Sequence, residues 1–496
     1  MRVALLPLDD RPCHTRFPAR LAEAAGIELL LPPRELLGWF DRPGDPDGVL
    51  DWLEDAATSC DALAVCVEMA TCGGLVTSRR SGTAAQAALD RLDRMAAILP
   101  LCPGPKYLGS VIMRATVTVS AADQMDAYAR IARYSELRES ADSGDREALG
   151  EIRSIEQSLP PGVLDDYLAA RERNHSVNLR CVDLAAGGIV DGLVLTQEDC
   201  RPRGIHRREQ AALLRRAACL DPGRVLLHPG ADELSMALLA RAAVAVARIQ
   251  PRARVRLLPP EGGDRIAPFE DQPIRGTVDG QARAAGVALV EARRAPLLAV
   301  IAPLEGPTDL TGDDYPASRG GSTDWIREGL DTLAGGGGPL VLADCAVANG
   351  AHLPVLDALA DHPARQRLLA YLAWNTAGNT LGTATALLAL LPLMPDGYQA
   401  LERFRFERLV DDAIYQSVVR AELVRWVEDR GGDPHRMSPS LARAAEEWLS
   451  ARLIAAAEGR GWVPKGLTWD IALPWDRTFE CDVELRPEPA PSMGTA

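Results

Sequence analysis

The stretch ALLPLDDRP, residues 4–12, decides the fold class. It begins as an apolar run typical of a strand that is buried on both faces, and it ends with two aspartates, an arginine and a proline. A buried strand does not need paired carboxylates at its exit, whereas a pocket at the edge of a sheet can use them. In open α/β sheets, ligands bind beyond the carboxyl ends of the strands. The stretch therefore predicts a parallel sheet with a polar pocket at one edge.

Similar apolar runs return along the chain and alternate with helical stretches. Helical spacing of apolar residues over 83–99 places a helix between two of these runs. Further strands are expected over 27–32, 62–69, 107–113, 192–199, 224–233, 254–260, 297–305 and 339–345. The alternation indicates an α/β protein with parallel sheets and helices on both faces, in a Rossmann-like order, with a barrel-like order also open.

The length and the changes of pattern predict several domains. The chain has 496 residues, which is too long for one compact core. We expect an N-terminal α/β domain over 1–119, a helical insertion over 120–185, a second α/β domain over 186–361, a mostly helical C-terminal region with a final strand pair over 362–487, and a disordered tail over 488–496.

Composition narrows the class of partner. The net charge is -15 and no stretch is strongly basic, so we expect no nucleic-acid partner. The N-terminus does not resemble a signal peptide, and the apolar stretch 383–394 is too short to span a membrane. The ten cysteines have no zinc-finger spacing and sit in apolar runs. We therefore expect a cytoplasmic protein with reduced thiols, no membrane partner, no cofactor and no metal, and the oligomeric state stays open.

Carboxylates recur where the predicted strands end. One such acid is explained by helix capping or turn formation. Paired acids exceed what a cap requires, and like charges held together raise the pKa of one of them, which suits a general acid. The acids at these positions are Asp9, Asp10, Glu68, Glu198, Asp199, Asp232, Glu233, Glu305 and Asp344. We take Asp9, Asp10, Asp232 and Glu233 as the candidate catalytic residues.

Other polar residues join the predicted pocket. The turn CGGLVTSRR (72–80) offers backbone N–H groups and Arg79 to an anion, or is a plain glycine turn. The stretch AYLAWNTAGNTLGTATA (370–386) places amides and a tryptophan among apolar residues, which suits a sugar or a buried polar network. The candidate substrate-binding residues are Arg11, Glu68, Arg79, Glu198, Asp199, Asp344, Asn349, Trp374, Asn375, Asn379, Trp475 and Asp476. The stretch RLVDDAIYQSVVR (408–420) is interpreted as a salt-bridged surface helix.

Seven of these stretches together resemble one known family. They are LPLDDRP, LLPPRELLG, GGLVTSRR, HPGADE, LADCAVANG, WNTAGNTLG and LPWDRTFE. The chain is similar over residues 2 to about 482 to the bacterial family catalogued as domain of unknown function 4127. The resemblance implies no settled activity, although members of the family often accompany genes for sugar uptake and amino-sugar catabolism. Glu68 and the pair Glu198-Asp199 depart from the expected aspartates, which puts their catalytic roles in doubt.

Three functions compete on this evidence. A glycoside hydrolase needs two carboxylates, which the chain offers in surplus, and the family resemblance points to amino-sugar glycosides. The same acids suit a divalent cation for isomerase, lyase or phosphoester chemistry. A non-catalytic intracellular sugar-binding protein is the third. The sequence favours the hydrolase, with a sugar or glycoside as its small-molecule partner.

Overall fold

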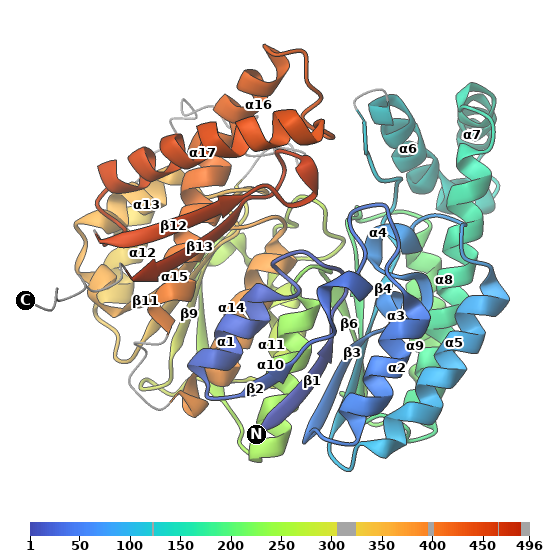
Figure 1. Ribbon diagram of the computed structural model, residues 1–496, viewed down its shortest axis with the longest axis horizontal. Coiled ribbons are helices and arrows are strands. Elements are labelled where there is room, and N and C mark those ends of the chain that lie inside the picture. The colour runs from blue at the N-terminus through green and yellow to red at the C-terminus, as the bar shows by residue number, and fades with distance from the viewer. Residues whose placement is uncertain (122–123, 305–323, 395–400, 465, 488–496) are drawn as a thin grey trace, which may run out of the picture.

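The computed structural model describes residues 1–121, 124–304, 324–394, 401–464 and 466–487. The strand-end acid predicted at residue 305 and the predicted tail over 488–496 lie outside these residues. The described chain contains two parallel sheets and one antiparallel strand pair (Figure 1). The α/β class is therefore confirmed, and both parallel sheets are open, so the barrel-like order is excluded for the described residues.

The first sheet has six parallel strands in the order β2-β1-β3-β4-β5-β6. Its strands are β1 (Arg2–Leu6), β2 (Glu28–Leu30), β3 (Ala62–Cys66), β4 (Lys106–Ile112), β5 (Gly192–Gln197) and β6 (Val225–Pro229). The strand order reverses between β1 and β3, and such a switch point opens a crevice at the carboxyl ends of the strands. The segment Asp9–Arg11 follows β1 directly into that crevice.

The second sheet has five parallel strands in the order β11-β10-β9-β7-β8. They are β7 (Arg252–Leu258), β8 (Ala288–Leu289), β9 (Leu297–Ile301), β10 (Leu340–Asp344) and β11 (Leu368–Leu372). Read from the other edge, the order is β8-β7-β9-β10-β11, which corresponds to β2-β1-β3-β4-β5 in the first sheet. The two halves therefore share a flavodoxin-like strand order, although the amino-acid sequence shows no internal repeat.

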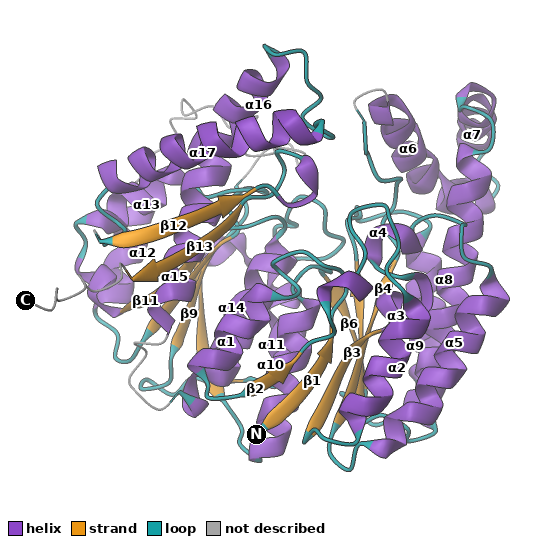
Figure 2. Cartoon of the chain, viewed as in Figure 1, coloured by secondary structure: helices purple, strands orange, loops and turns teal. Residues whose placement is uncertain are grey.

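A shared layer of helices joins the two sheets. In the largest core cluster, one face of each sheet packs on α1 (Arg16–Ala24), α10 (Leu234–Ala247), α11 (Ile274–Ala285) and α14 (Ala377–Leu390). Figure 2 shows α10, α11 and α14 between the two sets of strands. All fourteen residues of α14 are buried, as expected for a helix enclosed on every side. Because one core spans both sheets, the carboxyl ends of the strands in the two sheets face a shared region.

Further helices cover the outer faces of both sheets. On the first sheet they are α2 (Pro46–Ala57), α3 (Val67–Cys72), α5 (Ala85–Ile98) and α8 (Val163–Ala186), and on the second α12 (Asp324–Ala334) and α13 (Leu353–Ala360). The other helices of the first half are α4 (Leu75–Ser78), α6 (Met125–Asp142), α7 (Arg146–Ser158) and α9 (His206–Ala217). The predicted helical stretch over 120–185 is formed by α6, α7 and α8.

The C-terminal segment crosses the top of the second half (Figure 1). It contains α15 (Glu402–Arg408), a π-helix (Leu409–Val419), α16 (Arg420–Glu428), α17 (Pro439–Gly459) and the antiparallel pair β12 (Leu467–Ala472) and β13 (Asp482–Pro487). The predicted final strand pair and its turn at Trp475 and Asp476 are confirmed.

Sheet membership differs from the predicted division of the chain. The boundary placed at 185/186 falls inside the first sheet, because β5 and β6 extend it. The boundary at 361/362 cuts β11 from the second sheet, and no strand was predicted there. The sequence of a buried apolar strand does not indicate which sheet the strand joins. In β11, the apolar run LLAYL continues into polar residues, and these hid the strand pattern.

The stretch 408–420 is not a surface helix. Asp411 and Asp412 are buried in the π-helix and both pair with Arg408, at 2.9 and 2.8 Å. Burial raises the pKa of Asp412 to about 7. The predicted ion pairs are therefore present, but they are buried and not at the surface.

In the part of the chain that the structure covers, every helix is too short or too polar to cross a membrane.

Candidate functional site

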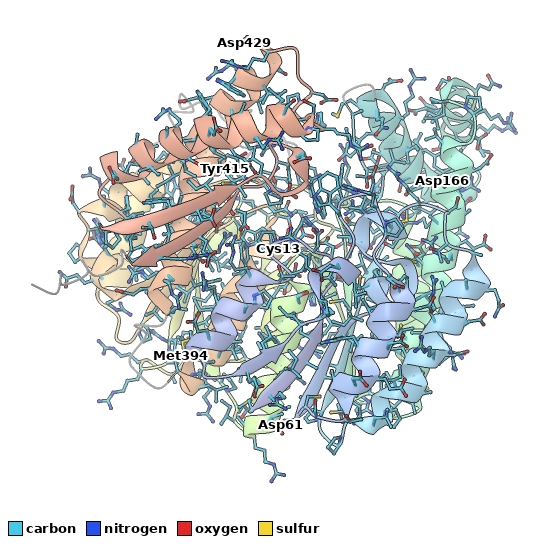
Figure 3. The ribbon with its side chains drawn as sticks, viewed as in Figure 1. Cys13, Asp61, Asp166, Met394, Tyr415 and Asp429 are labelled. Atoms are coloured by element: carbon cyan, nitrogen blue, oxygen red, sulfur yellow. The ribbon has the colours of Figure 1, made fainter. Side chains whose placement is uncertain are left out.

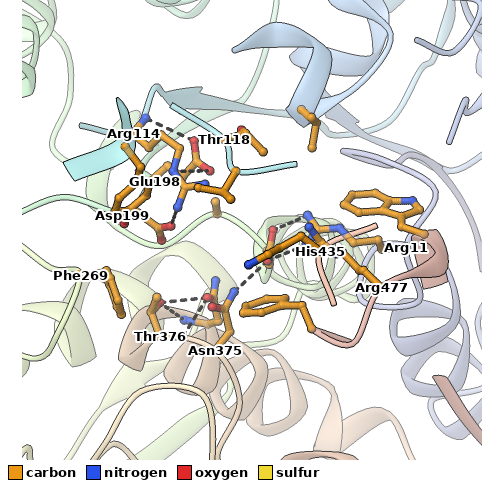
Figure 4. Close-up of a pocket in the computed structure, with 18 of the residues that line it drawn as sticks. Arg11, Arg114, Thr118, Glu198, Asp199, Phe269, Asn375, Thr376, His435 and Arg477 are labelled. Atoms are coloured by element: carbon orange, nitrogen blue, oxygen red, sulfur yellow. Dashed lines mark hydrogen bonds and ion pairs between the residues drawn. The ribbon is translucent and has the colours of Figure 1, made fainter. Parts of the chain in front are cut away.

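A cavity of about 390 Å³ lies where the strand ends of the first sheet meet the C-terminal segment. Its wall takes residues from the loops after β4, β5 and β6, the start of α14, and the turn between β12 and β13. In Figure 4, Arg114, Glu198 and Asp199 form one side, and Arg11, His435 and Arg477 lie across from them. Eight of the predicted site residues line it: Arg11, Arg79, Glu198, Asp199, Asp232, Asn375, Asn379 and Trp475.

The centre of the wall is an ion pair between Arg11 and Asp232. The Nη2 and Nη1 atoms of Arg11 donate to Asp232 Oδ1 and Oδ2 at 2.7 and 3.0 Å. Arg11 Nε and Nη2 also donate to Asp9, the latter at 2.7 Å. Asn375 Nδ2 adds a hydrogen bond of 2.9 Å to Asp232 Oδ2. The loops that follow two strands, at residues 9 and 232, are thus joined through one guanidinium.

Asp9 and Asp232 are held in their ionised forms. Burial by itself favours the neutral acid, but the charge of Arg11 outweighs it and lowers the pKa of Asp9, and Arg11 with His14 holds that of Asp232 well below its usual range. The ring of His14 is fixed by Ser235, with Nδ1 and Oγ 3.0 Å apart. The site therefore presents carboxylates that stay charged at every physiological pH.

Asp10 behaves differently because it faces Trp475. The indole Nε1 donates to Asp10 Oδ1 at 2.7 Å. Burial and the neighbouring charge of Asp9 raise the pKa of Asp10 to about 6. Trp475 itself lines the cavity, and Arg11 lies over its ring with Cζ 4.6 Å from the centroid. Asp10 does not line the cavity, so it sits one hydrogen bond behind the wall.

The opposite side of the cavity carries a second charged group. Glu198 pairs with Arg79, whose Nη1 donates to Thr118 Oγ1 at 2.8 Å. Asp199 pairs with Arg114. Burial and the neighbouring Arg79 lower the pKa of Arg114. The predicted anion site at Arg79 is therefore filled by a carboxylate of the chain itself.

The start of α14 fixes the amides of the site. Thr376 Oγ1 and the Asn379 side chain form a reciprocal capping box. Asn375 and Asn349 have positive φ angles of 51° and 55°, and Asn349 N donates to Asn375 O at 2.7 Å. Asn349 and Trp374 line a smaller adjoining cavity of about 40 Å³, together with Cys13, which lies near the centre of the molecule (Figure 3).

Five predicted residues, besides Asp10, lie outside the walls of these two cavities. Asp9 supports Arg11, as described above. Glu233 is fully buried and accepts from Asn379 Nδ2 at 2.7 Å and Gln281 Nε2 at 2.6 Å, so it ties α10 to α14 and α11. Asp344 accepts from the backbone N–H groups of 346 and 352. Asp476 adopts φ 47° in the turn after β12.

Glu68 is the fifth of these residues and lies inside the first half. Its Oε1 accepts from Ser110 Oγ at 2.9 Å and from Val111 N at 2.6 Å. Oε2 is buried without a hydrogen-bond partner. Burial raises the pKa of Glu68 to about 7. This carboxyl supports the strand-end region and has no direct access to the cavity.

Eight of the residues that line the cavity were predicted from the sequence, and most of its wall was not. Thr376, Arg477 and Phe479 lie inside the quoted motifs and Gln197 lies in the predicted strand 192–199, so their neighbours were the available signal. Arg114 directly follows the predicted strand 107–113, whereas Tyr128, Phe269 and His435 carry no local signal and reach the cavity from loops or helices far away in sequence. The acids of the wall that follow β5 and β6, Glu198, Asp199 and Asp232, are each paired with an arginine.

Comparison with known proteins identifies the family to which the chain belongs. No curated protein and no solved structure matches the chain significantly. The family model described as "Protein of unknown function (DUF4127)" matches residues 3–484, and therefore nearly the whole chain. The resemblance expected from the seven motifs is confirmed, and most of those motifs meet around the cavity. The chain belongs to the family of proteins of unknown function DUF4127.

Proposed function

We propose that the protein is a carbohydrate-active hydrolase whose substrate occupies the 390 Å³ cavity. The observation that carries this proposal is the combination in one cavity of two strand-end carboxylates, Glu198 and Asp232, with aromatic residues and amides. The size lies in the range of about 300–1,000 Å³ typical of small-molecule sites. The wall includes the aromatic residues Tyr128, Phe269, Trp475 and Phe479 and the amides Gln197, Asn375 and Asn379.

The two catalytic tasks need different carboxyl groups. One group stays ionised, as base or nucleophile, and the low pKa of Asp232 suits that task. The other delivers a proton to the leaving oxygen. Asp10, with a pKa of about 6, suits the proton donor by its chemistry, although Trp475 must shift for it to reach the cavity. Glu198 suits it by position, since it already lines the wall.

A test on leaving groups separates these two donors. Removing a general acid abolishes hydrolysis of substrates with poor leaving groups but spares activated aryl glycosides. We expect this selective loss in Asp10→Asn or in Glu198→Gln, and not in both. An exposed control, Asp279→Asn on α11, should leave both substrate types unchanged. Equal loss on both substrate types in each variant would contradict an acid role for either residue.

The first experiment is a turnover screen of the purified protein against aryl glycosides and amino-sugar disaccharides. Five arginines line the cavity, so glycosides of acidic sugars belong in the panel: Arg11, Arg79, Arg114, Arg420 and Arg477. Release of a sugar from one of these compounds would support the proposal. Adding Mg²⁺ or Mn²⁺ to metal-depleted protein tests the divalent-metal alternative, which requires turnover only when the ion is present.

A non-catalytic sugar-binding role is the second candidate. It is favoured by one observation, because both oxygens of Asp232 are already engaged by Arg11 and Asn375. Saturable binding of a sugar without turnover of any glycoside would favour this role. We also propose a cytoplasmic location, in keeping with cysteines that sit in apolar runs of the sequence.

A further inference from the structure

Three buried side chains with metal-binding atoms converge beside the cavity. They are Cys200 in the loop after β5, His206 at the start of α9 and Asp271 in the loop before α11. One ligand atom from each lies within 4.8 Å of the others. Cys200 and His206 lie close together in the segment that joins β5 to α9, and the fold brings Asp271 to them from the distant loop before α11.

His206 gives an independent sign that something is bound here. The residue has no exposed surface, and neither of its ring nitrogens has a hydrogen-bond partner. Nε2 lies 3.6 Å from Asp271 Oδ2, which is too far for a hydrogen bond. A buried polar group without a partner costs free energy, and nearly all such groups in proteins are satisfied. Among the histidines of the described chain, His206 alone has both ring nitrogens buried without a hydrogen bond, and its contact with Asp271 at 3.6 Å is an ion pair only when the ring is protonated.

The carboxylate of the cluster is already oriented from behind. Gln210 Nε2 and Arg207 Nη1 donate to Asp271 Oδ2 at 2.7 and 2.9 Å. Metal-binding carboxylates in proteins are commonly supported by such outer hydrogen bonds. Gln210 Nε2 also donates to Gln197 Oε1 at 3.0 Å, and Gln197 lines the cavity. The cluster is therefore linked to the cavity wall through one amide.

We propose that Cys200 Sγ, His206 Nε2 and a carboxylate oxygen of Asp271 bind a Zn²⁺ ion. Sulfur, imidazole and carboxylate together suit zinc, whereas Ca²⁺ and Mg²⁺ prefer oxygen ligands alone. Ligand atoms around a tetrahedral zinc lie about 3–4 Å apart, so closing the cluster takes movements of about 1 Å. Three protein ligands leave the fourth position to water. The zinc ties the loop after β5 to the loop before α11.

This site acts on the cavity through its wall. Cys200 N donates to Phe269 O at 3.0 Å, and Phe269 and Asp199 both line the cavity. A metal at the cluster therefore fixes the backbone that presents these two side chains. The role is one of positioning, and it does not depend on which reaction the cavity performs.

Metal analysis of the full-length protein tests the proposal. Protein dialysed against metal-free buffer after brief exposure to Zn²⁺ should hold close to one zinc per chain. The variants Cys200→Ser and His206→Gln should hold almost none, whereas Cys345→Ser, which removes another buried thiol, should hold one. Wild-type protein that retains no zinc, or Cys200→Ser protein that retains all of it, would overturn the proposal.

A second measurement guards against variants that do not fold. Replacing zinc by Co²⁺ in the wild-type protein should produce the near-ultraviolet absorption of a thiolate-to-cobalt charge transfer. The same spectrum is expected from Cys345→Ser. Bound cobalt without that absorption in the wild type would show that no cysteine is a ligand, and would overturn the assignment without any variant of the cluster.

Discussion

Arg11 and Asp232 are 221 positions apart in sequence and form a bidentate ion pair with N···O distances of 2.7 and 3.0 Å. The pair joins the loop after β1 to the loop after β6, so it connects the two strand ends that flank the cavity. Its members are only 5% and 6% exposed, which means that solvent screens them little. The charges of this pair therefore support both the fold and the site.

Breaking this pair should be strongly destabilising. In Arg11→Met, Asp9 and Asp232 lose their shared cation while remaining buried, and we expect a loss of about 3–5 kcal/mol in the free energy of unfolding. The control is the exposed pair of Arg180 with Asp93, where Arg180→Met should cost less than about 1 kcal/mol. Urea unfolding measures both. Equal losses in the two variants would contradict the structural role of Arg11.

Glu68 should make stability depend on pH. Its pKa is about 7 in the folded protein against 4.5 ordinarily, so the folded state binds the proton more tightly than the unfolded state. Its contribution is complete below pH 4.5 and is lost as the pH rises through 7. Glu68→Gln mimics the neutral acid, so its stability relative to wild type should grow over this window, by on the order of 3 kcal/mol.

The comparison of Glu68→Gln with wild type isolates this one group, because all other titrations are common to both. Exposed Glu54→Gln serves as the control and should track the wild type across the same pH range. The measurement is the free energy of unfolding at a series of pH values from 4.5 to 8. A constant difference between Glu68→Gln and wild type would contradict the raised pKa.

Glycine positions test the packing of α14 against Glu233. A methyl group added at Gly382 would overlap Glu233 Cγ, whereas one added at Gly150, in α7, meets nothing within 4 Å. We expect Gly382→Ala to destabilise by about 1–3 kcal/mol because the buried carboxylate must move. Gly150→Ala should instead stabilise by up to about 1 kcal/mol, since alanine is the better helix former. A stabilising Gly382→Ala would show that Glu233 is not held as described.

Much of the fold could be predicted because parallel strands have a plain signature. The runs over 2–8, 62–69 and 192–199 are mostly apolar in their first part, and that part of each forms a strand. The meeting of Asp9, Arg11 and Asp232 followed from the rule that strand ends share one edge. Which sheet β5 and β6 join could not be predicted, since that depends on contacts between segments far apart in sequence.

The site residues could be predicted only in part, because the sequence does not show in which direction each side chain points. Asp232 and Glu233 are neighbours in sequence, yet one lines the cavity and the other is enclosed between helices. Asp9 and Asp10 likewise diverge, towards Arg11 and Trp475. The cluster of Cys200, His206 and Asp271 escaped notice because its third member is distant in sequence, so no spacing pattern existed to be found.

The most direct test of the central claim is the hydrolysis rate of wild type and Asp232→Asn on the best glycoside from the screen. The variant keeps the Arg11–Asp9 pair, and its folding is checked by circular dichroism and thermal unfolding. We predict that turnover falls by about 10²–10⁴-fold in folded Asp232→Asn, while the Asp279→Asn control keeps the wild-type rate. A folded Asp232→Asn protein with wild-type turnover, or a wild-type protein that binds sugars and hydrolyses no glycoside, would contradict the account.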